Sequence, residues 1–199
     1  MAHSAIFERP SQKKMKNVTV FLAEGFEEIE AITVIDVLRR AGANVSTVSI
    51  TGEKLVHGAH QLPVVADMLF EETNFAAIDM LILPGGMPGA KNLNAHDGLK
   101  KQILRFHEQQ KPLAAICAAP LVFGHLNILK GRSAVCYPGF EQELKEADVQ
   151  LKPTVADGHI ITGRGVGTAL EFALRITEKL LSKEKADQLA KAMLVEGWH

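Results

Sequence analysis

The segment from Ile78 to Pro84, with the sequence Ile-Asp-Met-Leu-Ile-Leu-Pro, constrains the fold more than any other part of the chain. Its apolar residues fall on both faces of a strand, so other parts of the protein must cover both faces. Strands of this kind are typical of parallel sheets, because the connections between parallel strands place helices on the sheet. The segment therefore predicts a parallel sheet packed between helices.

The remaining sequence alternates between β-rich runs and helical stretches. Besides this segment, strands are expected at residues 17–23, 44–50 and 112–116, with a small hairpin at 55–65 and short β-like stretches near Ser133 and His159. Helices are expected at about residues 27–41, 98–109, 118–126, 166–181 and 183–193. Strands that alternate with helices form a mostly parallel sheet with helices on both faces. The sequence therefore predicts an α/β fold.

The length of 199 residues fits one compact domain better than two. There is no internal repeat and no linker, so we expect residues 17–199 to form a single domain. Residues 1–16 differ, because Arg9, Lys13 and Lys14 lie among polar residues without the apolar stretch of a signal peptide. We expect an N-terminal extension there rather than a targeting peptide, or a true start at Met15.

Charge and hydropathy exclude several functional classes. The 22 Lys and Arg residues nearly balance the 23 Asp and Glu residues, which leaves no electrostatic footprint for nucleic acid or an anionic membrane. No apolar run approaches the roughly 20 residues that would span a bilayer. Two cysteines, Cys117 and Cys136, are too few for a disulfide scaffold and are typical of a reducing compartment. We therefore expect a cytoplasmic protein with no nucleic-acid or membrane partner.

Cys117 is the first candidate for chemistry. It follows the predicted strand 112–116, precedes a predicted helix and has small neighbours in the sequence Ile-Cys-Ala-Ala-Pro. A sharp strand-to-helix turn of this kind exposes a nucleophile, and bulky neighbours would clash there. The start of a helix also favours the thiolate, so we expect a lowered pKa for Cys117. An inert buried cysteine is the competing interpretation, and it is the one we prefer for Cys136.

Glu30 is the second candidate. It lies in the predicted helix 27–41, on a face that it shares with Glu27 and Val34 at spacings of three and four residues. Acidic residues in a first helical turn complement the helix dipole, which accounts for Glu27 and Glu28. That account is weaker for Glu30, whose face is otherwise apolar. A carboxyl beside a thiolate would share one proton with it, because two ionised groups repel each other, and this predicts an acid–base pair.

The third candidate is the loop Pro84-Gly-Gly-Met-Pro-Gly89 directly after the buried strand. Consecutive glycines let backbone N–H groups approach a ligand or a developing oxyanion closely. The loop lacks the Gly-Lys-Ser/Thr ending of a phosphate-binding loop, so a nucleotide phosphate is not expected. A simple tight turn is the alternative interpretation.

Two further patterns are interpreted as structural. The segment Gly163-Arg-Gly-Val-Gly-Thr168 follows a β stretch and opens a helix, but a dinucleotide fingerprint has Gly or Ala where Thr168 stands. We interpret it as close packing of a helix on the sheet. The eight histidines show no metal-binding spacing, so no metal is expected, and His96 and His107 are expected to be exposed.

These segments, together with Asp36-Val-Leu-Arg-Arg-Ala-Gly42, resemble the motifs of the ThiJ/PfpI superfamily in their order and spacing. The resemblance covers residues 17 to about 194 and is greatest to the parkinsonism-associated protein deglycase branch. It implies a flavodoxin-like three-layer sandwich with a mostly parallel central sheet. It also implies a homodimer.

The resemblance assigns roles to individual residues. The residue that matches Cys117 is the family's nucleophile, which is easily oxidised to a sulfinate, and the residue that matches Glu30 is its carboxyl partner. Backbone amides that match Gly86 and Ala118 line the oxyanion site, and Glu27 matches an acidic residue near the pocket and the dimer contact. The residues expected to bind the oxyanion or substrate are Gly85, Gly86, Ala118, Glu27, Tyr137, Pro138 and His60.

The chain departs from the family pattern at two positions. His60 stands where close relatives carry an arginine that helps to bind anions, which implies weaker or pH-dependent anion binding. Many members have a histidine where this chain has Tyr137, before Pro138, so a Cys-His-Glu triad cannot form at that place. A phenol is a poor base near neutral pH. This leaves Cys117 and Glu30 as a dyad and predicts slow turnover.

Two functions from different classes follow. The first is a cofactor-independent cysteine enzyme, of the glyoxalase III or protein deglycase kind, which converts reactive dicarbonyls such as methylglyoxal or their adducts into hydroxy acids. The second is an oxidative-stress sensor or chaperone in which Cys117 only cycles through oxidation states. The protease branch has a histidine where Ala118 stands, and the glutamine amidotransferases depend on a late His-x-Glu that is missing here, so neither activity is expected.

Overall fold

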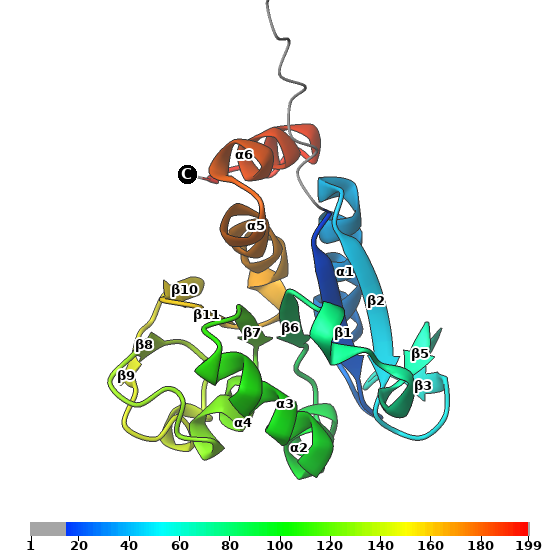
Figure 1. Cartoon of the computed structure of the whole chain (residues 1–199). Coiled ribbons are helices and arrows are strands. Elements are labelled where there is room, and N and C mark those ends of the chain that lie inside the picture. The colour runs from blue at the N-terminus through cyan, green and yellow to red at the C-terminus, as the bar shows by residue number, and fades with distance from the viewer. Residues whose placement is uncertain (1–14, 199) are drawn as a thin grey trace, which may run out of the picture.

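The computed structural model describes residues 15–198, and a seven-stranded sheet runs through them in the order β10-β11-β7-β6-β1-β2-β5 (Figure 1). Its strands are β1 (Asn17–Leu22), β2 (Asn44–Ser49), β5 (Met68–Leu69), β6 (Met80–Leu83), β7 (Leu113–Ile116), β10 (Thr154–Asp157) and β11 (Ile160–Gly163). Neighbouring strands are parallel except for β10 and β11, which form an antiparallel pair at one edge. The predicted mostly parallel sheet is confirmed.

Helices cover both faces of this sheet. They are α1 (Glu28–Ala41), α2 (Gly89–Ala95), α3 (Asp97–Glu108), α4 (Pro120–His125), α5 (Ala169–Leu180) and α6 (Lys183–Ala192). Helix α1 packs against α5 and α6, whereas α2 contacts α3 and α4, and the two groups lie on opposite faces of the sheet (Figure 1). The predicted α/β fold with a flavodoxin-like layering is therefore confirmed.

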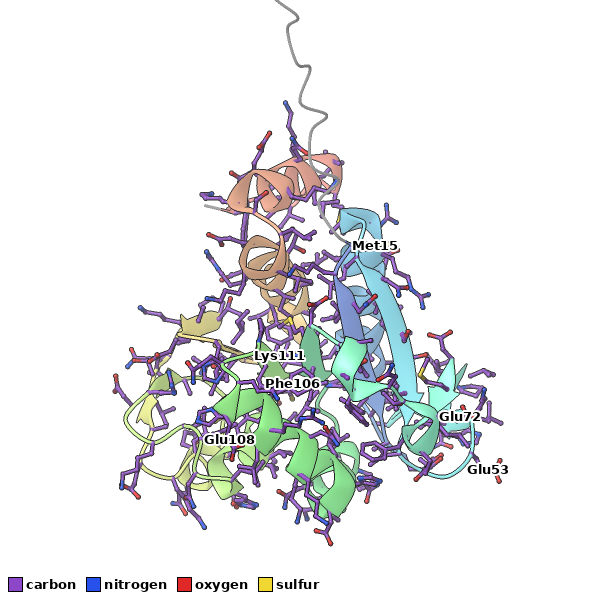
Figure 2. The ribbon with its side chains drawn as sticks, in the orientation of Figure 1. Met15, Glu53, Glu72, Phe106, Glu108 and Lys111 are labelled. Carbon is purple, nitrogen blue, oxygen red and sulfur yellow. The ribbon has the colours of Figure 1, made fainter. Side chains whose placement is uncertain are left out.

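The centre of the core is formed by β6 and β7, in which every residue is buried. This confirms the interpretation of the segment around Ile82 as a strand with both faces covered. Side chains from both helical layers pack on these two strands, and sticks fill the space between the ribbons (Figure 2). The sheet is thus a rigid platform for the loops at its carboxyl edge.

Short elements complete the fold outside the main sheet. Strands β3 (Leu55–His57) and β4 (Pro63–Val65) form the predicted antiparallel hairpin, and β8 (Ser133–Ala134) pairs in parallel with β9 (Asp148–Val149). Single turns of 3₁₀ helix lie at Phe70–Glu72, Phe75–Ala77, Glu141–Glu143 and Val166–Thr168. Helix α2 and strands β5 and β9 were not predicted, because each is too short to show a clear hydrophobic period.

Of the predicted extension at residues 1–16, only Met15 and Lys16 belong to the described residues. Helix α1 ends where predicted, at Gly42, whose φ of 90° is the left-handed conformation that a helix C-terminus favours in glycine. Among the helices described here, none is long and apolar enough to cross a membrane.

The order of the parallel strands brings three separate loops together. Strands β1, β6 and β7 are direct neighbours, so their carboxyl ends lie at one edge of the sheet. The residues that follow them are 23–27, 84–89 and 117–119 respectively. Ligand sites of open α/β sheets lie at this edge. The three segments singled out from the sequence therefore meet in space.

Candidate active site at the carboxyl edge of the sheet

Cys117 occupies a tight turn directly after β7. Its φ of 65° lies in the left-handed region, which residues other than glycine rarely adopt. Two backbone hydrogen bonds hold the turn: Cys117 N donates to the carbonyl of Gly163 at 2.9 Å, and Tyr137 N donates to the carbonyl of Cys117 at 2.8 Å. The residue is only 8% exposed. This strand-to-helix turn has the geometry that a nucleophile elbow requires.

Glu30 lies on the buried face of α1 and is fully enclosed. Its Oε2 atom accepts a hydrogen bond of 2.8 Å from Gly85 N, and Oε1 accepts none from any nitrogen or hydroxyl donor of the described residues. Cys117 lies next to this carboxyl, because one Cβ placed at Gly85 would be 2.6 Å from the Cβ of Cys117 and 2.7 Å from Oε2 of Glu30. The two groups also shift each other's pKa. The structure therefore brings together the two residues predicted to form an acid–base pair.

Burial raises the pKa of Glu30 to about 7. The Gly85 amide and the Cys117 thiol both favour the ionised carboxylate, and the nearby carboxylate of Glu27 opposes it, but loss of water outweighs these effects. Glu30 therefore exchanges its proton near neutral pH, well above the range of an ordinary glutamate. A carboxyl with this pKa is suited to both accepting and donating a proton.

The pKa of Cys117 is raised to about 12, so the expectation of a lowered pKa is wrong. Burial is the largest cause, and the carboxylate of Glu30 adds to it by repelling a second negative charge. The helix that was expected to stabilise the thiolate begins only at Pro120, three residues beyond the cysteine. A thiolate therefore forms readily only when Glu30 holds the shared proton.

Backbone amides of Gly86 and Ala118 face the sulfur of Cys117, and both favour the thiolate. These are the two amides expected to line an oxyanion site. Gly86 has a φ of 90°, and a Cβ there would lie 2.5 Å from the nitrogen of Glu27, so no other residue fits. The glycine loop thus carries donors directed at the position where a negative charge would develop.

The backbone amide of Gly85 bonds the carboxyl of Glu30, whereas Gly85 was expected to bind the oxyanion or substrate. Its amide hydrogen is already committed to Glu30 and its carbonyl accepts from the nitrogen of Glu27 at 3.0 Å. A Cβ at Gly85 would lie 2.6 Å from the Cβ of Cys117 and 2.7 Å from Oε2 of Glu30. Gly85 therefore positions Glu30 and makes room for the thiol, and its own amide is not free for a substrate.

Glu27 and its neighbour Glu28 do more than complement the helix dipole. Glu27 is the N-cap of α1, and its side chain accepts a hydrogen bond of 2.7 Å from the backbone of Glu30. Glu28 is 5% exposed and accepts bonds from the His60 nitrogen at 2.7 Å and from the His60 ring Nδ1 at 2.8 Å. The sequence analysis assigned Glu28 only to the helix dipole and missed this contact, because His60 lies 32 positions away along the chain.

His60 is largely exposed at the rim of the site. Its contact with Glu28, which is the larger cause, and the more distant Glu27 raise the pKa of the His60 imidazole. Glu27, Glu28 and His60 place three possible ligand atoms within 4.8 Å of one another. Oxygens of both carboxylates already hold backbone amides, which accounts for the cluster without a metal. The anion-binding role implied for His60 stays a prediction.

Tyr137 and Pro138 lie on the opposite side of Cys117. Tyr137 is 48% exposed, and its ring lies over Gly165, where a Cβ would come within 3.1 Å of it. Both residues line a groove together with Arg164 and the following residues 165–168. Tyr137 therefore lies next to the backbone of Cys117, while the predicted contact of Tyr137 and Pro138 with a substrate stays a prediction.

Cys136 is buried as expected, whereas the expectation that His96 and His107 are exposed is wrong. Cys136 is buried, and burial raises its pKa to about 11, in agreement with a structural role. His96 and His107 are half-buried rather than exposed. His96 is the N-cap of α3 and packs against the ring of Phe70, and His107 bonds the buried His159 at 2.9 Å. The contact between His107 and His159 has no signal in the sequence, because the two residues lie 52 positions apart.

The segment around Gly163 lies where a helix packs closely on the sheet, as predicted. A Cβ at Gly163 would lie 2.9 Å from side-chain atoms of both Ile116 and Phe172, so α5 approaches the sheet closely here. The short 3₁₀ turn Val166–Thr168 then leads into α5. The glycines in this segment therefore serve packing beside the site.

The layered fold and this site together define a class: α/β sandwich proteins with a cysteine on a strained turn after a central strand, facing a buried carboxyl. Residues 16–179 match the model of the DJ-1/PfpI family. Proteins named as DJ-1 homologues are similar to this chain over about nine tenths of its length. The chain belongs to the DJ-1/PfpI family, which confirms the resemblance found in the sequence.

Three relatives illustrate this similarity. Protein DJ-1 homolog B of Arabidopsis thaliana is 40% identical over 179 residues, which cover 89% of this chain but 41% of that protein, so the chain spans less than half of its length. Protein dj-1beta of Drosophila melanogaster is 39% identical over 183 residues, covering 90% of this chain and 97% of the relative. Its crystal structure has a TM-score of 0.88 at 35% identity and covers 92% of this chain and 99% of that one.

The third relative is the protein of Schizosaccharomyces pombe named glutathione-independent glyoxalase DJ-1. It is 27% identical over 189 residues, which cover 90% of this chain and 98% of the relative. The family thus includes a protein named for an enzymatic activity.

Proposed function

We propose that this protein is a cofactor-independent cysteine enzyme that converts 2-oxoaldehydes such as methylglyoxal, or their adducts with amines and thiols, into 2-hydroxy acids. One observation carries the proposal: the carboxyl of Glu30 and the amides of Gly86 and Ala118 all face the sulfur of Cys117. This arrangement supplies a nucleophile, a proton carrier and oxyanion donors within one enclosed space.

The proposed reaction begins with Glu30 protonated and Cys117 as the thiolate. The sulfur adds to the aldehyde carbon, and the amides of Gly86 and Ala118 hold the oxygen while it is negative. Glu30, ionised after giving its proton to that oxygen, removes the hydrogen of the former aldehyde carbon as a proton and returns it to the neighbouring ketone carbon. The proton of the hydroxyl group on the former aldehyde carbon passes to the ketone oxygen, so the first carbon becomes a thioester carbonyl and the second carries the new hydroxyl group. Water then cleaves the resulting thioester to release lactate and the thiol. The aldehyde carbon is oxidised and the ketone carbon reduced, so no external oxidant is needed.

The name of the Schizosaccharomyces pombe relative supports this class of reaction for the present chain. Tyr137 stands beside Cys117 where a histidine would serve as an additional base, and a phenol is a poor base at neutral pH. We therefore propose slow turnover, limited by a dyad that must supply both the thiolate and the proton transfer.

We also propose that two copies of the chain associate through an apolar surface beside the site. Helix α1 exposes Ile29 and Ile32, and the β3–β4 hairpin exposes Leu62 and Val65, at 45% to 68% exposed area. Glu28 bonds the backbone of His60 and so fixes the hairpin beside the start of α1. Light scattering tests this: Ile32→Glu should yield monomers, whereas Leu151→Glu, on a distant surface residue, should not. A monomeric parent protein would contradict the proposal.

The activity is tested by incubating the purified protein with methylglyoxal in the absence of glutathione and metal and measuring lactate. The parent protein should form lactate, Cys117→Ser should form none, and Cys136→Ser should match the parent because its thiol lies outside the site. Unchanged lactate formation by Cys117→Ser, or no lactate from the parent, would exclude the enzyme for this substrate class.

A redox sensor or chaperone is the second candidate. The observation that favours it is the raised pKa of Glu30, since a protonated carboxyl can donate a hydrogen bond to an oxidised sulfur. In that case mild peroxide should change Cys117 and the protein's ability to hold unfolded clients, while methylglyoxal remains unconsumed. Lactate formation dependent on Cys117 would favour the enzyme instead.

A further inference from the structure

A groove of about 370 Å³ lies beside the turn that carries Cys117. One wall is formed by Tyr137 and Pro138, and the other by residues 164–168. The backbone of Cys117 is hydrogen-bonded next to both walls. Tyr137 N donates to the carbonyl of Cys117, and Cys117 N donates to the carbonyl of Gly163, the residue before Arg164. The groove therefore lies next to the residue that would hold a substrate, and the far end of a substrate longer than methylglyoxal is the part that could enter it.

Arg164 is the charged residue that lines the groove. Its side chain is half-buried, yet it forms no ion pair and donates no side-chain hydrogen bond among the residues described here. Most other partly buried guanidinium groups of the chain are paired, as Arg132 with Asp157 and Arg175 with Glu178. The positive charge of Arg164 also lowers the pKa of the neighbouring Cys136.

The acidic groups near the groove form no ion pair with Arg164 in the described part of the chain. Glu141 faces the same cysteine from the other side, but its carboxylate accepts the backbone amide of Gly139 at 2.8 Å and makes no ion pair with Arg164. Glu27 and Glu28 lie across the site on α1, where they cap the helix and hold His60. An unpaired guanidinium beside a groove is a site for a carboxylate.

We propose that Arg164 makes this groove a carboxylate subsite and that the site prefers 2-oxoaldehydes bearing a carboxylate at the far end of a short carbon chain. This preference for a substrate class rests on the proposed function, whereas the anion subsite does not. For 4,5-dioxopentanoate the reaction adds one water, oxidises the aldehyde carbon and reduces the ketone carbon, and the product is 2-hydroxyglutarate. Methylglyoxal has no group that reaches Arg164.

The subsite is tested without turnover by alkylating Cys117 with iodoacetate or iodoacetamide, which differ mainly in charge. Peptide mapping gives the rate constant at Cys117 for each reagent at low ionic strength. The ratio of the two rate constants cancels any change in the amount of thiolate. Arg164→Gln should lower the iodoacetate-to-iodoacetamide ratio by about 3- to 10-fold, the effect of losing one partly screened positive charge at the subsite.

Two matched variants complete this test. Arg164→Lys should retain most of the ratio because it keeps the charge, and Arg105→Gln, which removes an exposed arginine of α3, should leave it unchanged. The difference between the parent and Arg164→Gln should shrink in 0.5 M NaCl, since salt screens the attraction (roughly a 4 Å screening length). An unchanged ratio in Arg164→Gln would overturn the subsite, whether or not the protein forms lactate.

The substrate class is tested by comparing kcat/KM for 4,5-dioxopentanoate with kcat/KM for methylglyoxal. The parent should favour the anionic aldehyde, and Arg164→Gln should reduce that preference mainly through a higher KM. Equal preference in the parent and Arg164→Gln would overturn the substrate assignment. Failure of the parent to convert either aldehyde would contradict the proposed function and this assignment together, while the alkylation ratio still decides the subsite.

Discussion

The buried carboxyl of Glu30 interacts with the thiol of Cys117 across the carboxyl edge of the sheet, and the two groups are coupled through one proton. Burial holds the pKa of Glu30 at about 7, and its charge helps to raise the pKa of Cys117 to about 12. The pair therefore has two competing states that hold one proton: in the first Glu30 is ionised and Cys117 is a neutral thiol, and in the second Glu30 is neutral and Cys117 is a thiolate.

Removing the charge of Glu30 should increase the reactivity of Cys117. In Glu30→Gln the repulsion between two negative groups is absent, so the thiol pKa should fall and alkylation by iodoacetamide at pH 7.5 should accelerate by about 10-fold or more. Cys136 serves as the internal control, because its burial does not depend on Glu30. Slower or unchanged alkylation of Cys117 in this variant would show that the carboxylate does not restrain the thiol.

Oxidation should stop at the sulfinate in the parent protein. A protonated Glu30 and the amides of Gly86 and Ala118 can together hold the two new oxygens on Cys117. In Glu30→Ala the carboxyl donor is missing, and mild peroxide should give mixtures that include the sulfonate. Intact-mass spectrometry measures the products, and the same distribution in both proteins would show that Glu30 does not stabilise the oxidised sulfur.

The His107–His159 pair should make the fold less stable in mild acid. Burial, followed by the charge of His107, lowers the pKa of His159 to about 4, so its imidazole stays neutral in the folded state when the unfolded chain already binds a proton. The contribution of the neutral His159 to the free energy of unfolding is fully present above pH 6.5 and is lost as the pH drops toward 4. A pKa shift of this size corresponds to about 3 kcal/mol.

Urea unfolding of the parent and of His159→Gln at pH 7 and pH 5 measures this effect. The variant should lose less stability than the parent between the two pH values, because it lacks the group that titrates. His125→Gln is the control, since His125 lies at the surface beside Glu143. Equal losses in the parent and in His159→Gln would assign the acid sensitivity to other groups.

The space at Gly85 should tolerate no side chain. A Cβ there would lie 2.6 Å from Cys117 and 2.7 Å from Glu30, so Gly85→Ala should displace the dyad and destabilise the protein by about 1–3 kcal/mol. Gly167→Ala is the matched control, with nothing within 4 Å of the added methyl group, and should change stability by less than about 0.5 kcal/mol. Thermal unfolding and Cys117 alkylation rates compare the two, and equal behaviour would contradict the crowding at Gly85.

Periodicity and strand order were sufficient to predict much of the fold. The apolar run around Ile82 required a buried parallel strand, and the spacing of Glu30 and Val34 placed the carboxyl on a buried helical face. Because parallel strands end at one edge, the sequence also predicted that Glu30 and Cys117 meet there. Helix α2 could not be predicted, since seven residues with glycine at the start show no clear period.

Quantities that depend on packing could not be predicted in the same way. Whether the pKa of Cys117 rises or falls depends on how deeply it is buried and where α4 begins, neither of which the pattern Ile-Cys-Ala-Ala-Pro determines. The contact of Glu28 with His60 joins residues 32 positions apart, and no local spacing records it. Sequence therefore predicted the residues of the site better than their chemistry.

The most direct test of the dyad is lactate formation from methylglyoxal by the parent, Cys117→Ser, Glu30→Ala and the double variant. If the two residues act as one unit, each single variant should lose nearly all activity and the double variant should lose no more than either one. Circular dichroism of all four proteins confirms that each is folded. Substantial lactate formation by Glu30→Ala, or losses that add in the double variant, would contradict a shared-proton dyad.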